Sequence, residues 1–161
     1  MRQTLRTLAD GERASFSGSF ARTGYKEVED EYGVTHYEPT LMLSNLRDEN
    51  ARQVTDHQWF NYDATWLALG ELKTGDLIQF TAEVQTYMKG RAGQHKQDYQ
   101  LTAPEELVLR HKQGTAERIA LPVDNADALI GYIMESNLRF YRATHRVIDT
   151  DYVDAWHAFK G

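Results

Sequence analysis

A cluster of basic residues in a short stretch with two glycines has the most readily interpreted chemistry in this 161-residue sequence. The stretch spans residues 88–97, and its cationic or titratable members are Lys89, Arg91, His95 and Lys96. Clustered cations bind phosphate groups, and glycines let the backbone adapt to them. The stretch therefore predicts a loop that contacts phosphates, although a solvated hairpin tip would have the same composition.

Aromatic side chains would supply the second requirement for binding unpaired bases, because a base can stack on an aromatic ring. The candidates are Tyr37, Trp59, Tyr62, Tyr87 and Tyr99. Tyr87 follows Glu83 and Gln85 at steps of two, so strand alternation puts it on a polar face. Tyr37 and Trp59 could stack on bases or belong to the core, where aromatic residues are common.

The stretch from Arg22 to His36 carries charges of both signs. Arg22 and Lys26 could extend a phosphate-binding surface, whereas the acidic residues at 27 and 29–31 would repel phosphates. The charges and two glycines predict a long loop or a mobile hairpin tip. The acidic segment 27–31 is then a solvated loop or a surface that faces a protein.

Catalytic and metal-binding patterns are weak. Asp56 and His57 could form an acid/base pair, but adjacent residues of a strand point to opposite faces. The absence of cysteine excludes disulfides, thiolate metal sites and a cysteine nucleophile. The histidines, including His145 and His157, have no metal-ligand spacing, and no phosphate loop or nucleophile elbow is present. We therefore expect no metal, no cofactor and no catalytic residue.

Period-two alternation of apolar and polar residues predicts the strands that would position these side chains. The expected strands are 14–20, 37–44, 53–60, the segment after the 73–76 turn containing Ile78, Phe80, Ala82 and Val84, and 98–110 with an interruption at Pro104. Residues 45–50 have the composition of a turn. A short helix is expected over 63–69, with Asp63 as its N-cap and Gly70 ending it.

The last third of the chain has helical periodicity instead. A helix is expected over 124–134, residues 137–147 continue it or begin a second one, and a last helix begins at Asp149 or Thr150. Arg139, Arg142 and Arg146 would line one helical face as a solvated or phosphate-binding stripe. An apolar stripe on the last helix comprises Tyr152, Val153, Trp156 and Phe159. This stripe must pack on the rest of the chain or on a second subunit, which would make a homodimer.

Three strands, a short helix and two further strands resemble, in this order, the oligonucleotide/oligosaccharide-binding (OB) fold. Residues 72–84 are similar to the turn and fourth strand of such domains, with SH3-like and double-psi barrels as structural alternatives. We expect a mainly β protein, with an OB-type five-stranded barrel over 1–112 and a helical extension over 113–161. The functional likeness is to single-stranded DNA-binding and replication-protein-A-like domains. It implies binding through strands two and three and the loops between strands one and two and strands four and five.

Composition limits the class of protein. With 41% hydrophobic and 26% charged residues, the chain should fold as an ordered domain. Its net charge of −6 argues against non-specific coating by nucleic acid. Residues 1–10 lack the continuous apolar stretch of a signal peptide, and no segment approaches a membrane span, so we expect a cytoplasmic protein without membrane contact.

These observations predict a non-enzymatic protein that binds single-stranded nucleic acid, with DNA the expected form. The alternative is an acidic protein-interaction module, or an inhibitor of a nucleic-acid enzyme, that contacts its partner through residues 27–31 or the C-terminal helices. Small acidic proteins of phages and plasmids offer an analogy for both. A nuclease on the same barrel would need clustered carboxylates for calcium, and no such cluster is evident.

Overall fold

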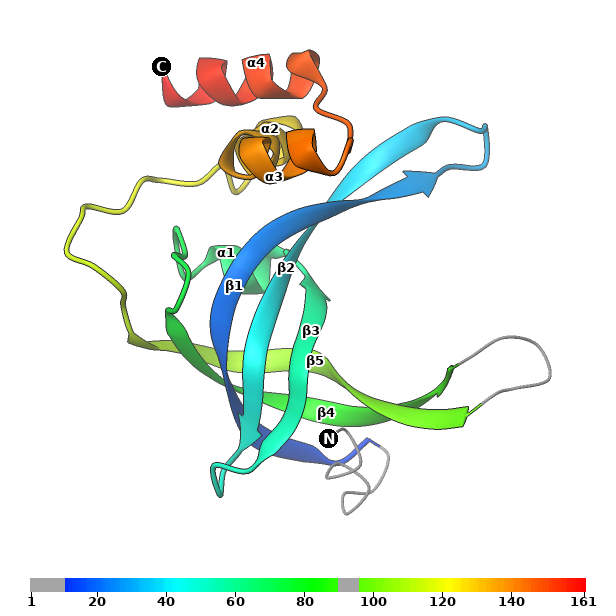
Figure 1. The fold of residues 1–161 in the computed structure, drawn as a ribbon, viewed down its shortest axis with the longest axis vertical. Helices are drawn as coiled ribbons and strands as arrows, with labels where there is room; N and C mark the ends of the chain where they lie inside the picture. The colour runs from blue at the N-terminus through cyan, green and yellow to red at the C-terminus, as the bar shows by residue number, and fades with distance from the viewer. Residues whose placement is uncertain (1–10, 90–95) are drawn as a thin grey trace. The chain divides into compact units, whose positions relative to one another are not determined.

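The computed structural model describes residues 11–89 and 96–161, with the side chains of 86–89 and 96–98 not described. The strands are β1 (Arg13–Glu29), β2 (Thr35–Asp48), β3 (Gln53–Asn61), β4 (Leu77–Lys89) and β5 (Lys96–His111). Helix α1 (Ala64–Leu67) lies between β3 and β4 in the chain. The helices after β5 are α2 (Ala126–Ser136), α3 (Leu138–Ala143) and α4 (Thr150–Lys160) (Figure 1).

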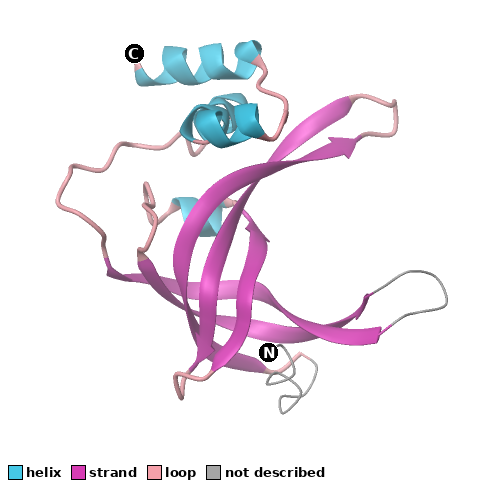
Figure 2. Ribbon diagram, in the orientation of Figure 1, coloured by secondary structure: helices cyan, strands magenta, loops and turns pink. Residues whose placement is uncertain are grey.

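The five strands form one antiparallel sheet in the order β3-β2-β1-β4-β5 (Figure 2). This confirms the prediction of a mainly β fold with a short helix after the third strand and helices at the C-terminal end. The edge strands are β3 and β5, and within 11–89 and 96–161 no ladder joins them. Closure of the sheet into a barrel therefore stays a prediction.

The chain divides into two compact units, each made of three separate segments. Unit 1 comprises Met1–Ala21, Leu43–Gln58 and Leu72–Thr115, and unit 2 comprises Arg22–Met42, Trp59–Glu71 and Ala116–Gly161. Strands β1, β2 and β3 each contribute residues to both units. The division at residue 112 expected from the sequence stays a prediction.

Unit 1 has a core built by regular strand alternation. Ile78, Ala82 and Val84 are fully buried on one face of β4, as their period-two spacing predicts. Phe16 of β1 pairs in register with Phe80 of β4, and the two ring centroids are 6.3 Å apart. This region confirms the first and fourth predicted strands.

A buried glutamine links the two edge strands inside unit 1. The Gln58 side chain in β3 donates from Nε2 to the carbonyl oxygen of Leu101 at 2.7 Å. Its Oε1 accepts from the backbone N–H of the same residue at 3.1 Å. Leu101 belongs to β5, so one amide side chain satisfies both backbone groups of a residue on the opposite edge strand.

Two predicted interruptions of strands in unit 1 are wrong. Strand β2 continues through the expected 45–50 turn as far as Asp48, because Leu46 is fully buried and Asn45 tolerates its φ of 50°. Strand β5 continues through Pro104, where Ala103 and Glu106 take φ of 49° and 54°. The pairing register shifts on the facing strand between Gln79 and Glu83, so β-bulges absorb the proline.

The predicted loop over Arg22–His36 is also wrong. Strand β1 continues to Glu29, and β2 begins at Thr35. Thr23 and Tyr25 are buried, which gives the strand a packed face that its charged residues conceal in the sequence. The connecting turn is closed by Asp30, whose Oδ1 accepts from the backbone N–H groups of Tyr32 and Val34. The acidic residues at 27–31 thus lie on a strand end and a tight turn.

The helices of unit 2 follow their predicted caps closely. Asp63 caps α1 and Asp149 caps α4, each accepting from a backbone N–H two residues later, and Asn125 caps α2. The α4 stripe packs on α2 at Gly131, where an added Cβ would lie 1.9 Å from the carbonyl oxygen of Tyr152. The apolar stripe is therefore covered in part by this chain itself.

Among the described residues, no helix is long and apolar enough to span a bilayer.

Candidate nucleic-acid interface

The basic stretch at 88–97 begins in β4 and ends in β5. Arg91 and His95 lie outside the described residues. Tyr87 and Lys89 belong to β4 and Lys96 to β5, with the backbone of Lys89 paired to that of Lys96. Their side chains are not described, so the predicted phosphate contacts and the stacking by Tyr87 stay predictions.

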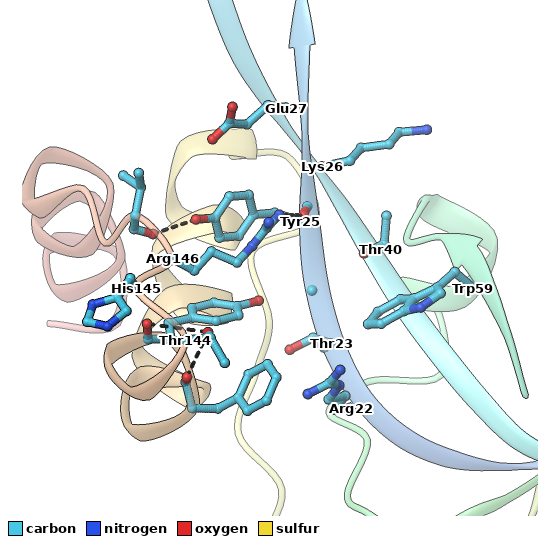
Figure 3. A pocket seen from close by; sticks show the side chains of 14 residues that line it. Arg22, Thr23, Tyr25, Lys26, Glu27, Thr40, Trp59, Thr144, His145 and Arg146 are labelled. Atoms are coloured by element: carbon cyan, nitrogen blue, oxygen red, sulfur yellow. Dashed lines mark hydrogen bonds between the residues drawn. The ribbon is translucent and has the colours of Figure 1, made fainter.

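A second group of predicted site residues comes together in unit 2. Arg22, Lys26 and Trp59 all line one pocket of about 710 Å³, together with residues of β2 and of the segment 140–147 (Figure 3). Three of its lining residues are cationic, Arg22, Lys26 and Arg146, and one is acidic, Glu27. The lining therefore has a formal charge of +2, whereas the whole chain has −6.

Trp59 is held by a close approach to β1. An added Cβ on Gly24 would lie 2.9 Å from Cζ3 of the Trp59 ring and 3.1 Å from the hydroxyl oxygen of Thr40. Only glycine leaves room for the indole to lie over the strand at this point. Trp59 nevertheless remains 41% exposed, while Thr40 is buried. The indole is therefore not part of the buried core, and the stacking of a base on it stays a prediction.

Arg22 lies beside this ring. Its guanidinium carbon is 5.6 Å from the Trp59 ring centroid and 4.2 Å from that of Phe140. Within the described chain its Nε is buried without a hydrogen-bond partner. In that part of the chain no ion pair involves Arg22, so this cation is held by aromatic contacts and is available to an anion.

Lys26 occupies the other side of Gly24 on β1. Its Nζ donates to Oδ1 of Asn61 at 3.0 Å and lies 3.5 Å from a carboxylate oxygen of Glu38. Both Lys26 and Glu38 are about half exposed, so water screens this ion pair. In Figure 3, Lys26 and Trp59 lie on one side of β1, whereas Tyr25 and Glu27 lie on the other.

Tyr37 has a packing role. Its ring contacts Tyr25 and Tyr152 edge to face, with centroid distances of 5.1 and 5.2 Å. Burial raises the pKa of Tyr25, whose phenol donates to the carbonyl oxygen of Val147. The Tyr37 ring is therefore a structural contact and does not line the pocket.

Arg146 belongs to the pocket for a reason that sequence periodicity could not reveal. Helix α3 ends at Ala143, so the predicted helical stripe with Arg139 and Arg142 is wrong for this residue. Its guanidinium carbon instead lies 4.2 Å from the Tyr25 ring centroid, and Nη2 donates to the Tyr25 carbonyl oxygen. Sequence patterns also give no sign of Gly24 and Phe140 as site residues. Their roles come from contacts with distant segments, Gly24 with Trp59 and Phe140 with Arg22.

The groups that line the pocket can bind an anion or an aromatic ring. Its lining offers cations, aromatic rings and threonine hydroxyls, with no described nucleophile hydrogen-bonded to a base. Asp56 and His57 are adjacent residues of β3, so their side chains point to opposite faces of the strand. Among the described residues, no group of three or more His, Cys, Asp or Glu is arranged to hold a metal ion.

In comparisons with protein-family models, with curated proteins and with solved structures, no match to this chain was found.

Proposed function

We propose that this protein binds single-stranded nucleic acid, with DNA the expected form, and that it is not an enzyme. The observation that carries the proposal is the pairing of an exposed Trp59 ring with the Arg22 guanidinium in one pocket. A base stacked on an aromatic ring contributes about 1–3 kcal/mol, and a cation beside the ring can bind the adjoining phosphate. The name Trp59 site is used below for Arg22, Gly24, Lys26, Thr40 and Trp59.

The finer fold assignment, an OB-type barrel, belongs to the same proposal. The strand order leaves β3 and β5 as the edges, and the two hydrogen bonds between Gln58 and Leu101 support an approach of these strands. The Trp59 site draws on β2 and β3, which is where the resemblance to OB-fold domains implies ligand binding. The cations at 89, 91 and 96 and the ring of Tyr87 would extend the binding surface.

A second candidate is favoured by a different region. Tyr32 and Val34, at the turn between β1 and β2, are 83% and 51% exposed and stand beside acidic residues at 29–31. An exposed aromatic with an acidic rim suits a basic protein surface. This is the interaction-module alternative.

Fluorescence anisotropy with a labelled oligo-dT of about 30 nucleotides at low salt tests the primary proposal. We expect the Trp59→Ala and Arg22→Gln variants each to weaken binding about tenfold, by loss of the stack or the phosphate contact. The exposed Arg139→Gln of α3 is the matched control and should bind as the parent does. No binding by the parent protein at tens of micromolar would contradict the proposal.

Salt dependence separates the two candidates. Affinity for the oligonucleotide should fall with added salt, since cations on the protein replace counterions on the strand. A protein captured from lysate after nuclease treatment, and lost in a Tyr32→Ser variant, would favour the interaction module instead.

A further inference from the structure

Every second residue of β1 from Arg22 to Lys26 belongs to the Trp59 site. Arg22, Gly24 and Lys26 alternate, so their side-chain positions fall on one face of the strand. The middle position is the glycine over which the Trp59 ring lies. The ring is therefore flanked along the strand by one cationic residue on each side.

Contacts across the strands support this arrangement. Thr40 of β2 and Trp59 of β3 meet at Gly24, and Glu38 and Asn61, two residues away on those strands, meet at Lys26. The two sets of contacts are neighbouring rows of one sheet face. With a rise of about 3.3 Å per residue, Arg22 and Lys26 start about 13 Å apart on the backbone, and long side chains can reach inward from both.

Resting on the proposed function, we infer that the Trp59 site takes a single nucleotide unit, with its base on Trp59 and a phosphate on each side. Arg22 binds one phosphate and Lys26 the other. The minimal ligand is a nucleoside 3′,5′-bisphosphate.

The charges around the site set its limits. Beyond Lys26, β1 carries Glu27 and Glu29 on its other face and the turn carries Asp30, so a third phosphate in this direction enters a region of negative charge. Glu38, with a carboxylate oxygen 3.5 Å from Nζ of Lys26, competes with a phosphate for this cation. Phosphate binding should therefore be weaker at Lys26 than at Arg22, which has no ion-pair partner among the described residues. Two phosphates thus account for the charge that the site offers.

Calorimetry with thymidine, its two monophosphates and thymidine 3′,5′-bisphosphate tests the inference directly. The bisphosphate should bind about tenfold or more tightly than thymidine, and each monophosphate should lie between them. Arg22→Gln and Lys26→Gln should each abolish the gain from one phosphate, and from different ones. Equal affinity for thymidine and the bisphosphate would overturn the inference.

The dependence of oligo-dT affinity on salt concentration, expressed as the slope of log affinity against log salt, counts the same two phosphates independently of other contacts. Each neutralised phosphate contributes about 0.7 to the slope for a single strand, so each variant should lower it by about 0.7 and the double variant by about 1.4. Glu38→Gln should strengthen bisphosphate binding several-fold without changing the slope, and Arg139→Gln should change neither quantity.

The outcomes separate the two levels of the argument. Oligo-dT binding whose slope is unaffected by Arg22→Gln and Lys26→Gln would overturn the single-nucleotide site while leaving the proposed function intact. Absence of binding to any oligonucleotide would overturn both.

Discussion

Among the described residues, unit 1 buries phenylalanine as its aromatic residue, whereas unit 2 buries tyrosines and tryptophans together with one phenylalanine, Phe60. In unit 1 the buried rings are those of Phe16, Phe20 and Phe80, which pack with leucine, isoleucine and valine. Within the described chain, all of the buried tyrosines and tryptophans belong to unit 2. They are Tyr25, Tyr62, Trp66, Tyr132, Tyr141 and Trp156. A phenylalanine ring needs only apolar neighbours, whereas phenol and indole groups also need a polar partner.

This difference explains where cations and aromatic rings meet. Trp156 donates to Glu135, Tyr25 donates to the Val147 carbonyl, and the cations Arg22, Arg146 and Lys160 lie against rings of unit 2. An interior of amphipathic aromatics brings polar groups and cations close to rings near the surface. Unit 1 instead provides a regular apolar sheet. The following predictions test this contrast, in order of decreasing effect.

The largest effect should come from closing the space between α2 and α4 in unit 2. Gly131→Val introduces atoms where a Cβ would already lie 1.9 Å from the Tyr152 carbonyl oxygen and 2.9 Å from Cβ of Trp156. We expect a loss of at least about 3 kcal/mol in the free energy of unfolding, measured in urea. Asp154→Ala, an exposed change on α4, should cost less than about 0.5 kcal/mol. A Gly131→Val protein of parent stability would contradict the close packing.

The corresponding change in unit 1 removes the hydrogen bonds of a buried polar side chain. Gln58→Ala leaves both backbone groups of the buried Leu101 without their side-chain partner. We expect a loss of about 2 kcal/mol in the free energy of unfolding, because each buried unsatisfied group costs on the order of 1–3 kcal/mol before any relaxation. Gln85→Ala removes an exposed glutamine of β4 and is the control. Equal urea midpoints for the two variants would show that the link to β5 contributes nothing.

A smaller change should affect binding more than stability. Gly24→Ala places a methyl group 2.9 Å from the Trp59 ring, which must move outward. We expect a cost of about 1 kcal/mol in stability and a several-fold loss of oligonucleotide affinity. Acrylamide quenching of tryptophan fluorescence should increase, because Trp66 and Trp156 are only 0% and 2% exposed and Trp59 dominates the quenchable signal. Ser17→Ala on the same strand should leave all three measurements unchanged.

The smallest effect concerns the pH dependence of unit 2. The hydrogen bond from His157 lowers the pKa of Glu135, with Oε1 of Glu135 2.6 Å from Nε2 of His157. A carboxyl with a lowered folded-state pKa stabilises fully above its unfolded value of about 4.3, and this contribution is lost as the pH falls through the folded value. Glu135→Gln should therefore flatten the acid side of a stability-against-pH curve.

This pH effect should amount to less than about 1 kcal/mol, because the pair is partly exposed. Chemical unfolding at several pH values between 3 and 7 measures it. The exposed Glu117→Gln serves as the control. If Glu135→Gln left the slope of stability against pH unchanged on the acid side, the pair of Glu135 and His157 would not contribute to the stability of unit 2.

Predictability also differs between the units. In β4, alternation identified Ile78, Phe80, Ala82 and Val84 as core, and all four are buried. In β1 beyond Ala21, the charged residues suggested a loop, and the packed residues Thr23 and Tyr25 were overlooked. Local charge and glycine content outweighed burial that arises from partners far along the chain.

For the candidate site, residue types were predictable but their grouping was not. Arg22, Lys26 and Trp59 were recognised singly as candidates, and the structure brings them into one pocket. The predicted helical stripe of Arg139, Arg142 and Arg146 is wrong for Arg146, since α3 ends at Ala143. The basic stretch at 88–97 remains a prediction from composition.

The sequence by itself determined what depends on neighbours along the chain. Period-two spacing specified the buried face of β4, and Asp63 and Asp149 specified helix starts through hydrogen bonds within one turn. Tertiary structure decided which segments face each other. Gln58 reaches Leu101, Gly24 admits the Trp59 ring, and Tyr25 packs on Tyr141 only because folding brings distant segments within a few ångströms. These contacts depend on geometry between segments, which no local pattern encodes.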